Sequence, residues 1–268
     1  MTHLLSIILV CVVPVLILVL AVYLVALKLR RNDLADVMWG LGFILIAWTS
    51  VIAGGNFGSS FTVHLVPVLV TIWGLRLASH IGQRWRHAKA EDQRYQEMRV
   101  RWGKHQAWHS LINVFLPQGF LMLVVSLPVI VTNTYSTVSG GTLVWVGAVV
   151  WAFGFIFESI GDHQLKGFLG DPANRGKIMM SGLWAYTRHP NYFGEVTQWW
   201  GLAIIALSVP YSWIGLLGAA TITYLITEVS GIPLAEAGFT GRPGWEDYKR
   251  QTPALIPRLS VPAKNLPK

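Results

Sequence analysis

The sequence predicts an all-α, polytopic integral membrane protein with about seven transmembrane helices. Of its 268 residues, 53% are hydrophobic and only 13% are charged, whereas about a quarter of the residues in a soluble domain are charged. Long apolar runs recur along the chain, and most are close to the roughly 20 residues that a helix needs to cross the hydrocarbon core. Thirteen tryptophans fit this interpretation, because tryptophan is enriched where a bilayer meets water.

The predicted spans follow one another with polar connections between them. The first apolar run is far longer than the roughly 7–15 residue core of a signal peptide, so we expect it to be retained. Asp36 opens the second span, where the helix dipole favours a carboxylate. Only "SVPYSW" separates the sixth span from the seventh, which indicates a tight helical hairpin. The predicted spans are residues 4–27, 36–54, 61–82, 111–132, 141–161, 196–210 and 212–232.

The basic residues predict the orientation of these spans. Lysines and arginines occupy the first, third and fifth connections and the C-terminal tail, whereas "AGGNFGSS", "TNTYSTVSGG" and "SVPYSW" contain none. Positively charged loops stay in the cytoplasm, so seven spans place the N-terminus outside and the C-terminus inside. The same distribution accounts for the net charge of +8 without nucleic acid, because basic cytoplasmic loops attract anionic membrane lipids.

The chain is predicted to be a single membrane domain over residues 1–268, because it contains no internal repeat and no Gly/Ser linker. Residues 259–268 have the composition of a flexible tail. The single cysteine, Cys11, excludes a disulfide framework and a thiolate metal cluster. The histidines lack metal-site spacing, so no metal is predicted, and neither a G-x-G-x-x-G nor a Walker loop is present.

Polar residues in the first three spans are the first candidates for function, because charged side chains in a span usually face a protein interior or a wet cavity. Asp36 is either a helix-start carboxylate or an acid near a polar group of a substrate, with Trp39 following it. Arg76 either reaches to the membrane interface or anchors an anionic ligand. The loop over residues 83–110 mixes acids and bases at helical spacing, typical of an amphipathic helix on the membrane surface.

The end of the fifth span carries a second group of polar residues. Glu158, Asp162 and Lys166 lie four residues apart in "FESIGDHQLKGF", so they share one face of a helix that continues beyond the span. A ladder of ion pairs is the alternative, but such pairs stabilise a helix by only about 0.2–0.5 kcal/mol each. Glu158 lies deep in the span, which favours a lined polar cavity.

The stretch "AYTRHPNYFGE" places polar residues directly before the sixth span. A residue before proline disfavours helix, whereas proline suits the first helical turn, so a helix is predicted to begin near Pro190. Asn191 and Glu195 then lie one turn apart, with Arg188 and His189 just outside the helix. Helix-start N–H groups beside cations favour phosphate, and the alternative is a polar loop without a ligand.

These motifs resemble a known superfamily. "GLWAYTRHPNYFGE", "ESIGDHQLKGFL" and "WEDYKRQTPALIP" are similar to the C-terminal region of the steroid 5α-reductase superfamily, which also contains sterol reductases and isoprenylcysteine carboxyl methyltransferases. "DVMWGLGF", "WGLRLASHI", "EDQRYQEMR" and "VFLPQGFLMLVVSLP" resemble a bacterial branch of steroid-reductase-like membrane proteins. The resemblance therefore covers nearly the full length of the chain.

The resemblance implies a seven-span fold that binds NADPH in a pocket facing the cytoplasm. We expect the protein to lie in a bacterial inner membrane. Residues 1–135 would form the substrate side, and residues 136–258 the cofactor-binding region. Glu158 and Asp162 match positions that contact the cofactor. Asn191 matches a contact to the nicotinamide amide, and Glu195 matches a polar neighbour.

Further cofactor positions follow from the same resemblance. Lys166 falls at a basic position, and Arg86 lies near an arginine that binds the phosphates. Glu236 and Tyr248 border the pocket. Preference for NADPH requires cations at the 2′-phosphate, for which Arg86, Arg188 and Lys166 are the candidates, with His189 nearby.

The substrate side departs from the family pattern. Steroid 5α-reductases polarise the 3-oxo group with a Gln-Glu pair and a tyrosine, but here the matching neighbourhoods offer only Asp36 and, at the tyrosine position, Trp73. An indole cannot supply a phenolic proton, so Asp36 and Tyr192 are the candidate donors. Trp39 and Arg76 are candidates for substrate contacts.

The predicted function is an NADPH-dependent reductase of an activated C=C bond in a lipophilic substrate. The enzyme alternative is an S-adenosylmethionine-dependent methyltransferase of the isoprenylcysteine type, but those enzymes have a downstream Glu-Glu pair where "IPLAEAGF" offers only Glu236. A non-enzymatic lipid-binding membrane protein is the third interpretation. Nucleic acid is not an expected partner.

Overall fold

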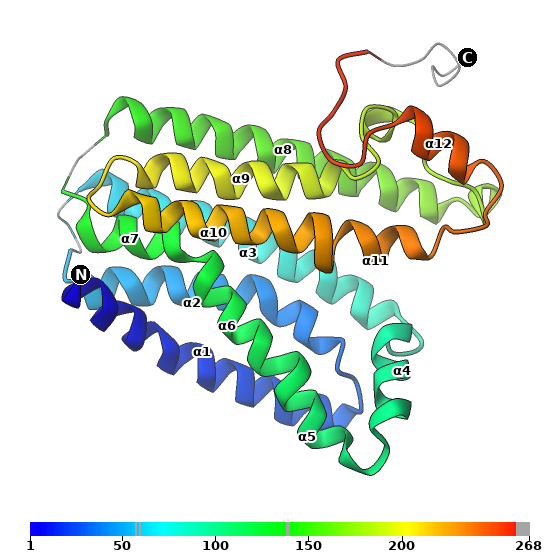
Figure 1. Ribbon diagram of the computed structural model, residues 1–268, viewed down its shortest axis with the longest axis horizontal. Helices are drawn as coiled ribbons and strands as arrows, with labels where there is room; N and C mark the ends of the chain where they lie inside the picture. Colours follow the sequence, from blue (N-terminus) through cyan, green and yellow to red (C-terminus); the bar gives the residue numbers. More distant parts are fainter. Residues whose placement is uncertain (57, 59, 138–139, 261–268) are drawn as a thin grey trace. The chain divides into compact units, whose positions relative to one another are not determined.

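The computed structural model describes residues 1–56, 58, 60–137 and 140–260. These residues form helices joined by loops, without a strand among them, which confirms the predicted all-α fold (Figure 1). Residues 57, 59 and 138–139, in two of the predicted connections, lie outside the described residues, as does most of the predicted flexible tail, residues 261–268.

The chain divides into two compact units, Met1–Val144 with Ile205–Gly218, and Trp145–Ile204 with Ala219–Lys268. Within the first unit, α2 contacts α1, α3, α6 and α7. The helices that lie wholly in the first stretch are α1 (Thr2–Leu29), α2 (Leu34–Gly54), α3 (Phe61–His87), α4 (Gln93–Trp102), η1 (Gly103–His105), α5 (Gln106–Ser110), η2 (Leu111–Phe115), α6 (Leu116–Val125) and α7 (Leu127–Tyr135).

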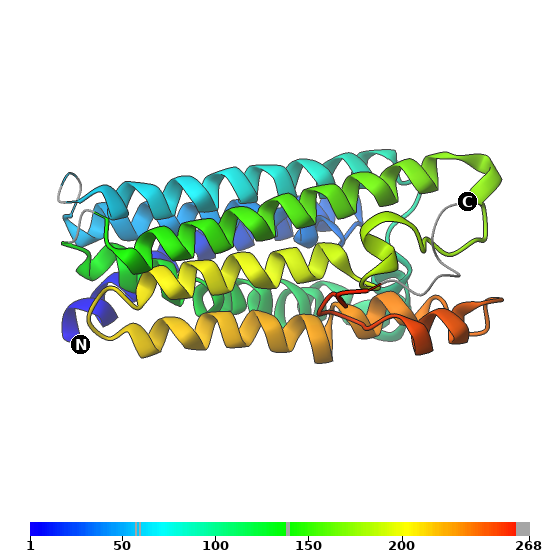
Figure 2. The ribbon, with the colours of Figure 1, turned by 90° about the horizontal axis from the view of Figure 1, so that it is seen from above.

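The remaining helices carry most of the second unit. The long helix α8 and helix α9 run side by side in both views (Figures 1 and 2). The elements are α8 (Thr142–Gly170), η3 (Pro172–Asn174), η4 (Gly182–Ala185), α9 (Pro190–Ala206), α10 (Ser212–Tyr224), η5 (Leu225–Val229), α11 (Ile232–Ala237) and α12 (Trp245–Gln251). The α9 start at Pro190 confirms the predicted helix start.

Six helical segments of the described chain are long and apolar enough to cross a membrane: Thr2–Leu29, Leu34–Gly54, Phe61–His87, Gln93–Val125, Thr142–Gly170 and Ser212–Ala237. They confirm a polytopic membrane protein. The sixth predicted span is not among them, because α9 has 17 residues, at the lower limit of the roughly 17–25 residues that span a bilayer. The predicted orientation stays a prediction.

The predicted span 111–132 is not one regular helix. It begins with the π-helical turn η2, continues as α6, and breaks at Ser126 before α7 begins. Pro128 lies in the first turn of α7. Proline lacks an N–H and has a fixed φ, so it is tolerated at a helix start but not in a helix interior. The sequence pattern missed this break because the apolar run continues through it.

Helices α8 and α9 approach closely because glycines face each other between them. A Cβ atom on Gly194 would lie 2.5 Å from Gly154 O and from Glu158 N, and a Cβ atom on Gly201 would lie 2.7 Å from Gly147 O. The α8 glycines Gly147, Gly154 and Gly161 recur at seven-residue intervals, so they lie on one side of the helix. Small residues at such positions let membrane helices pack backbone against backbone.

Replacing Gly194 with alanine tests this packing. The added methyl group would meet backbone atoms, which cannot rotate away, so we expect Gly194→Ala to lower the free energy of unfolding by on the order of 1–3 kcal/mol. Thermal unfolding of the purified chain in detergent measures the change. The control is Gly167→Ala on α8, where a Cβ atom meets nothing within 4 Å. Equal stability of the two variants would contradict the close approach.

Candidate functional site

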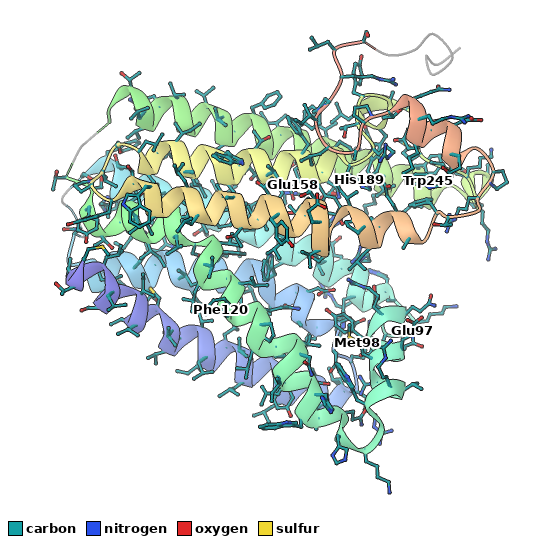
Figure 3. The ribbon with its side chains drawn as sticks, viewed as in Figure 1. Glu97, Met98, Phe120, Glu158, His189 and Trp245 are labelled. Atoms are coloured by element: carbon teal, nitrogen blue, oxygen red, sulfur yellow. The ribbon has the colours of Figure 1, made fainter. Side chains whose placement is uncertain are left out.

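A polar strip runs along the contact between α8 and α9. On α8, Glu158 is 2% exposed and Asp162 is 9% exposed. A Cβ atom on Gly161 would lie 3.2 Å from Asn191 N, so the first turn of α9 lies against the turn of α8 that carries Asp162. The structure therefore brings together three predicted residues, Glu158, Asp162 and Asn191, with Glu195 one turn further along α9. Figure 3 labels Glu158 in this part of the second unit.

Gln198 belongs to the same strip, although the sequence analysis did not identify it. It is 1% exposed, and its amide Nε2 donates to Glu158 Oε2 at 2.5 Å and to Gly194 O at 3.3 Å. The helical spacing of Asn191, Glu195 and Gln198 was the available signal, because residues three and four apart share one face.

Two amide oxygens in the strip are buried without a hydrogen-bond partner among the described residues. They are Asn191 Oδ1 and Gln198 Oε1, and the hydroxyl oxygen of Ser159 on α8 is buried in the same way. An unsatisfied buried acceptor costs about 1–3 kcal/mol, so such atoms in a native fold call for a partner that the protein itself does not supply. The unpaired acceptor atom of Asn191 fits a ligand with N–H donors, such as a carboxamide.

Arg188 and His189 meet at Glu236 on α11. Glu236 Oε1 accepts from Arg188 Nε at 2.7 Å and lies 3.1 Å from His189 Nε2. Lys249 lies further out, with its Nζ 3.9 Å from Glu236 Oε2. All three side chains at the centre of this group are largely buried, at 8%, 7% and 12% exposed for Arg188, His189 and Glu236. The contacts of Arg188 and His189 are thus directed to Glu236, and their predicted binding of phosphate stays a prediction.

The segment before α9 binds the C-terminal segment through hydrogen bonds. Arg188 also donates to the carbonyl oxygens of Lys249 and Thr252. Its backbone N–H donates to Pro253 O at 2.9 Å, and Thr187 Oγ1 donates to Ala254 O and Leu255 O. Thr187 and Arg188 therefore anchor the "TPAL" segment, which lies more than 60 residues further along the chain.

Tyr248 on α12 completes this connection. Its hydroxyl donates to Trp184 O at 2.6 Å, and its side chain is buried. Burial raises the pKa of Tyr248, so the phenol keeps its proton and remains a donor. Trp245, labelled in Figure 3, packs beside it and lies below the guanidinium of Arg188, 5.9 Å from ring centroid to Cζ. Tyr248 thus has a structural contact in addition to its predicted place at the pocket border.

His189 is stacked on Tyr192. Their ring centroids are 5.4 Å apart, with an interplanar angle of 24°. Burial lowers the pKa of His189, although the hydrogen bond with Glu236 opposes the shift. The imidazole is therefore neutral at physiological pH, and because Nε2 faces a carboxylate, Nε2 carries the proton. A neutral ring stacks on the candidate donor Tyr192 without adding charge to it.

The first unit contains its own polar group at the start of α2. Asp36 accepts a hydrogen bond from the Tyr95 hydroxyl at 2.8 Å, and Arg94 lies 3.7 Å from the carboxylate. Tyr95 was missed because the loop that carries it has the composition of a solvated helix, whereas its side chain is only 6% exposed. The structure therefore places a phenol beside the predicted acid.

The other predicted residues of the first unit have varied surroundings. Trp73 is buried, 2% exposed, and packs on Phe43 at 5.5 Å between ring centroids. Trp39 also packs on Phe43, at 5.2 Å between ring centroids. Arg76 is half-buried in α3, and Arg86 is exposed at its end. In the second unit, Lys166 is exposed on α8. The candidate site residues predicted from the sequence are thus divided between the two units.

An open hollow lies on α4 in the first unit, outside the predicted site. It is lined by Gln93, Gln96, Glu97, Val100 and Arg101, of which Figure 3 labels Glu97. None of these residues was a candidate from the sequence. Its position on the side of α4 away from Tyr95 makes it a surface feature of an amphipathic helix.

Comparisons with known proteins give the family. Residues 22–252 match the family described as "Protein of unknown function (DUF1295)", and the chain belongs to this family. It is also similar to "3-oxo-5-alpha-steroid 4-dehydrogenase 1" of Bos taurus, 38% identical over 64 residues, and of Homo sapiens, 37% identical over 65 residues. The match to "Steroid 5-alpha-reductase DET2" of Solanum lycopersicum is 28% identical over 114 residues. Together these matches confirm the steroid 5α-reductase-like family expected from the motifs.

The extent of these matches is limited. The alignments cover 24% of this chain and 24% of the bovine protein, 24% and 25% for the human protein, and 42% and 41% for the tomato protein. The matched part therefore spans about a quarter of the mammalian relatives. No solved structure matches the chain.

The burial of His189 predicts a pH dependence of stability. The folded-state pKa lies below the ordinary value of 6.5, so the unfolded chain binds a proton more readily, and stability falls as the pH drops through about 6.5 and below. When the pH is lowered from about 7.5 to about 5, we expect the free energy of unfolding to fall less in His189→Gln than in the native chain. Unfolding midpoints across this range measure the difference, and parallel pH curves would contradict it.

The Glu236 group predicts a large difference between two truncations. Glu236→Ala leaves the buried guanidinium of Arg188 without its carboxylate, which we expect to cost about 3–5 kcal/mol. Lys249→Ala removes only a half-exposed partner of the same carboxylate, and such pairs contribute about 0–1 kcal/mol. Thermal unfolding in detergent compares the two variants. Similar losses would show that Arg188 does not depend on Glu236.

Proposed function

We propose that the protein is an NADPH-dependent membrane reductase that reduces an activated C=C bond in a lipophilic, steroid-like substrate. The observation that carries the proposal is the buried acceptor of Asn191 at the start of α9, which has no partner among the described residues and lies beside the buried carboxyl groups of Glu158 and Asp162. The similarity to steroid 5α-reductases from mammals and tomato supports the same class of reaction.

The residues of the polar strip fit the nicotinamide end of the cofactor. Asn191 Oδ1 would accept an N–H of the carboxamide, which satisfies the orphaned atom. Glu158, Asp162 and Glu195 supply further acceptors for amide and hydroxyl donors. Lys166 and Arg86 are exposed on helix ends and would bind phosphate. When bound, NADPH supplies the hydride, while the protein orients and polarises.

The substrate side must stabilise the negative charge that develops on a carbonyl oxygen when an enone accepts a hydride at its β-carbon. Contacts that strengthen in the transition state accelerate such a step. Asp36 accepts a hydrogen bond from the Tyr95 hydroxyl, which fixes the orientation of its carboxyl group, and a protonated Asp36 would be the donor to the substrate oxygen. Tyr192 is the candidate donor in the second unit, and Trp73 would contribute packing only.

The predicted orientation agrees with this chemistry. With the N-terminus outside, the start of α9, the "RHPN" motif and the C-terminal segment lie on the cytoplasmic side, where NADPH is available. The substrate would enter from the lipid phase. We infer an integral protein of a bacterial inner membrane, with membrane lipids as its surroundings.

Cofactor binding by site variants tests the proposal. We expect Asn191→Ala and Glu195→Ala to weaken NADPH binding at least about tenfold, the effect of removing one hydrogen bond of about 1.4 kcal/mol. Energy transfer from tryptophan to NADPH in purified, nanodisc-embedded protein measures the affinity. The matched control is Asn113→Ala, an exposed residue of η2 whose amide donates to His109 O, and it should bind as the native chain does.

The rival functions give different results in the same preparation. Binding of S-adenosylmethionine with no NADPH binding would establish the methyltransferase. Co-purified lipid with neither cofactor would establish a lipid-binding protein. Unchanged NADPH affinity in both variants would remove the proposed site.

A further inference from the structure

The deepest polar contact in the described part of the second unit joins Glu158 and Gln198. The two side chains are 2% and 1% exposed, and the amide Nε2 lies 2.5 Å from the carboxyl Oε2. Neither residue lies at a helix end, since α8 covers Thr142–Gly170 and α9 covers Pro190–Ala206. A carboxyl group at such a position is expensive to bury unless it is hydrogen-bonded.

The glycines of the helix contact enforce this pairing. A Cβ atom on Gly154 would lie 2.8 Å from Gln198 N and 3.0 Å from Gln198 Cγ. A Cβ atom on Gly194 would lie 2.6 Å from Glu158 Cβ. Each long polar side chain therefore packs against a glycine of the opposite helix, which leaves it few rotamers and directs the two functional groups toward each other.

Gln198 has a different task from Asn191. The two residues are seven positions apart on α9, which is about 10 Å along a helix axis, so one carboxamide of a ligand does not reach both. Gln198 uses its nitrogen for Glu158 and for Gly194 O. Its contact with the expected cofactor site therefore passes through Glu158.

We propose that Gln198 is a positioning residue of the reductase site, whose amide holds the carboxyl group of Glu158 in the one orientation that the cofactor requires. This inference rests on the proposed function, because Glu158 is assigned to the cofactor there. The amide fixes Oε2, and the direction of the second carboxyl oxygen follows from it. In this role the amide nitrogen of Gln198 acts on the cofactor only through Glu158.

A carboxyl group in place of the amide gives a pH signature. In Gln198→Glu, two carboxyl groups face each other at the distance of the native contact, and they cannot both ionise without repulsion. At acid pH the introduced group keeps its proton and donates to Glu158 as the amide does. We expect near-native NADPH affinity at about pH 5 and a loss of at least about tenfold at about pH 8.

Three further variants separate positioning from packing. Gln198→Met keeps the volume without a donor, and we expect it to weaken NADPH binding about tenfold at every pH. The exchange Glu158→Gln with Gln198→Glu restores one acid and one amide, so its loss should be smaller than the sum of the two single losses. Gln118→Glu is the matched control on α6, where the glutamine Oε1 is also buried without a partner.

NADPH titrations of the full chain in nanodiscs, over this pH range, decide among the outcomes. A pH-dependent loss in Gln198→Glu, absent from Gln118→Glu, supports the proposal. A pH-independent affinity in Gln198→Glu, or losses that add in the exchange variant, overturns it while leaving the reductase intact. A native chain that binds no NADPH overturns the proposed function first, and this inference with it.

Discussion

The backbone contact between α8 and α9 is the constraint on which the candidate site depends. At Gly154, Gly194 and Gly201 backbone atoms of the opposite helix lie within 2.8 Å of the position that a Cβ atom would occupy, so a side chain at these positions would push the two helices apart. That geometry buries Glu158 and Gln198 together and brings Asn191 next to the turn that carries Asp162. In a bilayer, where apolar burial favours no particular helix pair, such close packing and polar pairing decide which helices associate.

The end of this helix pair at Pro190 is built from distant parts of the chain. Pro190 starts α9 and forces the preceding residues out of helical conformation, which turns Arg188 and His189 toward Glu236. Arg188 then holds the backbone of the C-terminal segment. The motif therefore has two roles. Asn191 provides an acceptor that is unpaired among the described residues, and Arg188 binds the C-terminal segment.

The sequence predicted features that local rules determine. Helix periodicity placed Glu158 and Asp162 on one face, and the position of Pro190 predicted the start of α9. It could not predict pairs between distant residues, such as Tyr95 with Asp36 or Arg188 with Glu236, which are 59 and 48 positions apart. Gln198 was missed because a neutral amide in an apolar run has no local partner. The break at Ser126 was missed because hydropathy does not respond to one proline.

The two polar groups of the chain differ in what they offer a ligand. The strip on α8 and α9 contains acceptors, namely the carboxyl groups and the amide oxygens that are unpaired among the described residues, whereas the group at Asp36 contains a carboxyl group that the Tyr95 hydroxyl holds in place and that can donate when it is protonated. Enone reduction needs both chemistries, because a carboxamide-bearing cofactor is oriented by acceptors and a developing oxyanion is stabilised by a donor. The tyrosine expected at the position of Trp73 is thus absent, but a phenol is still present in the same unit, on α4 instead of α3. In the proposed reductase the donor role of that tyrosine would therefore pass to Asp36, with Tyr95 fixing its orientation, a pairing that an alignment by motif does not show.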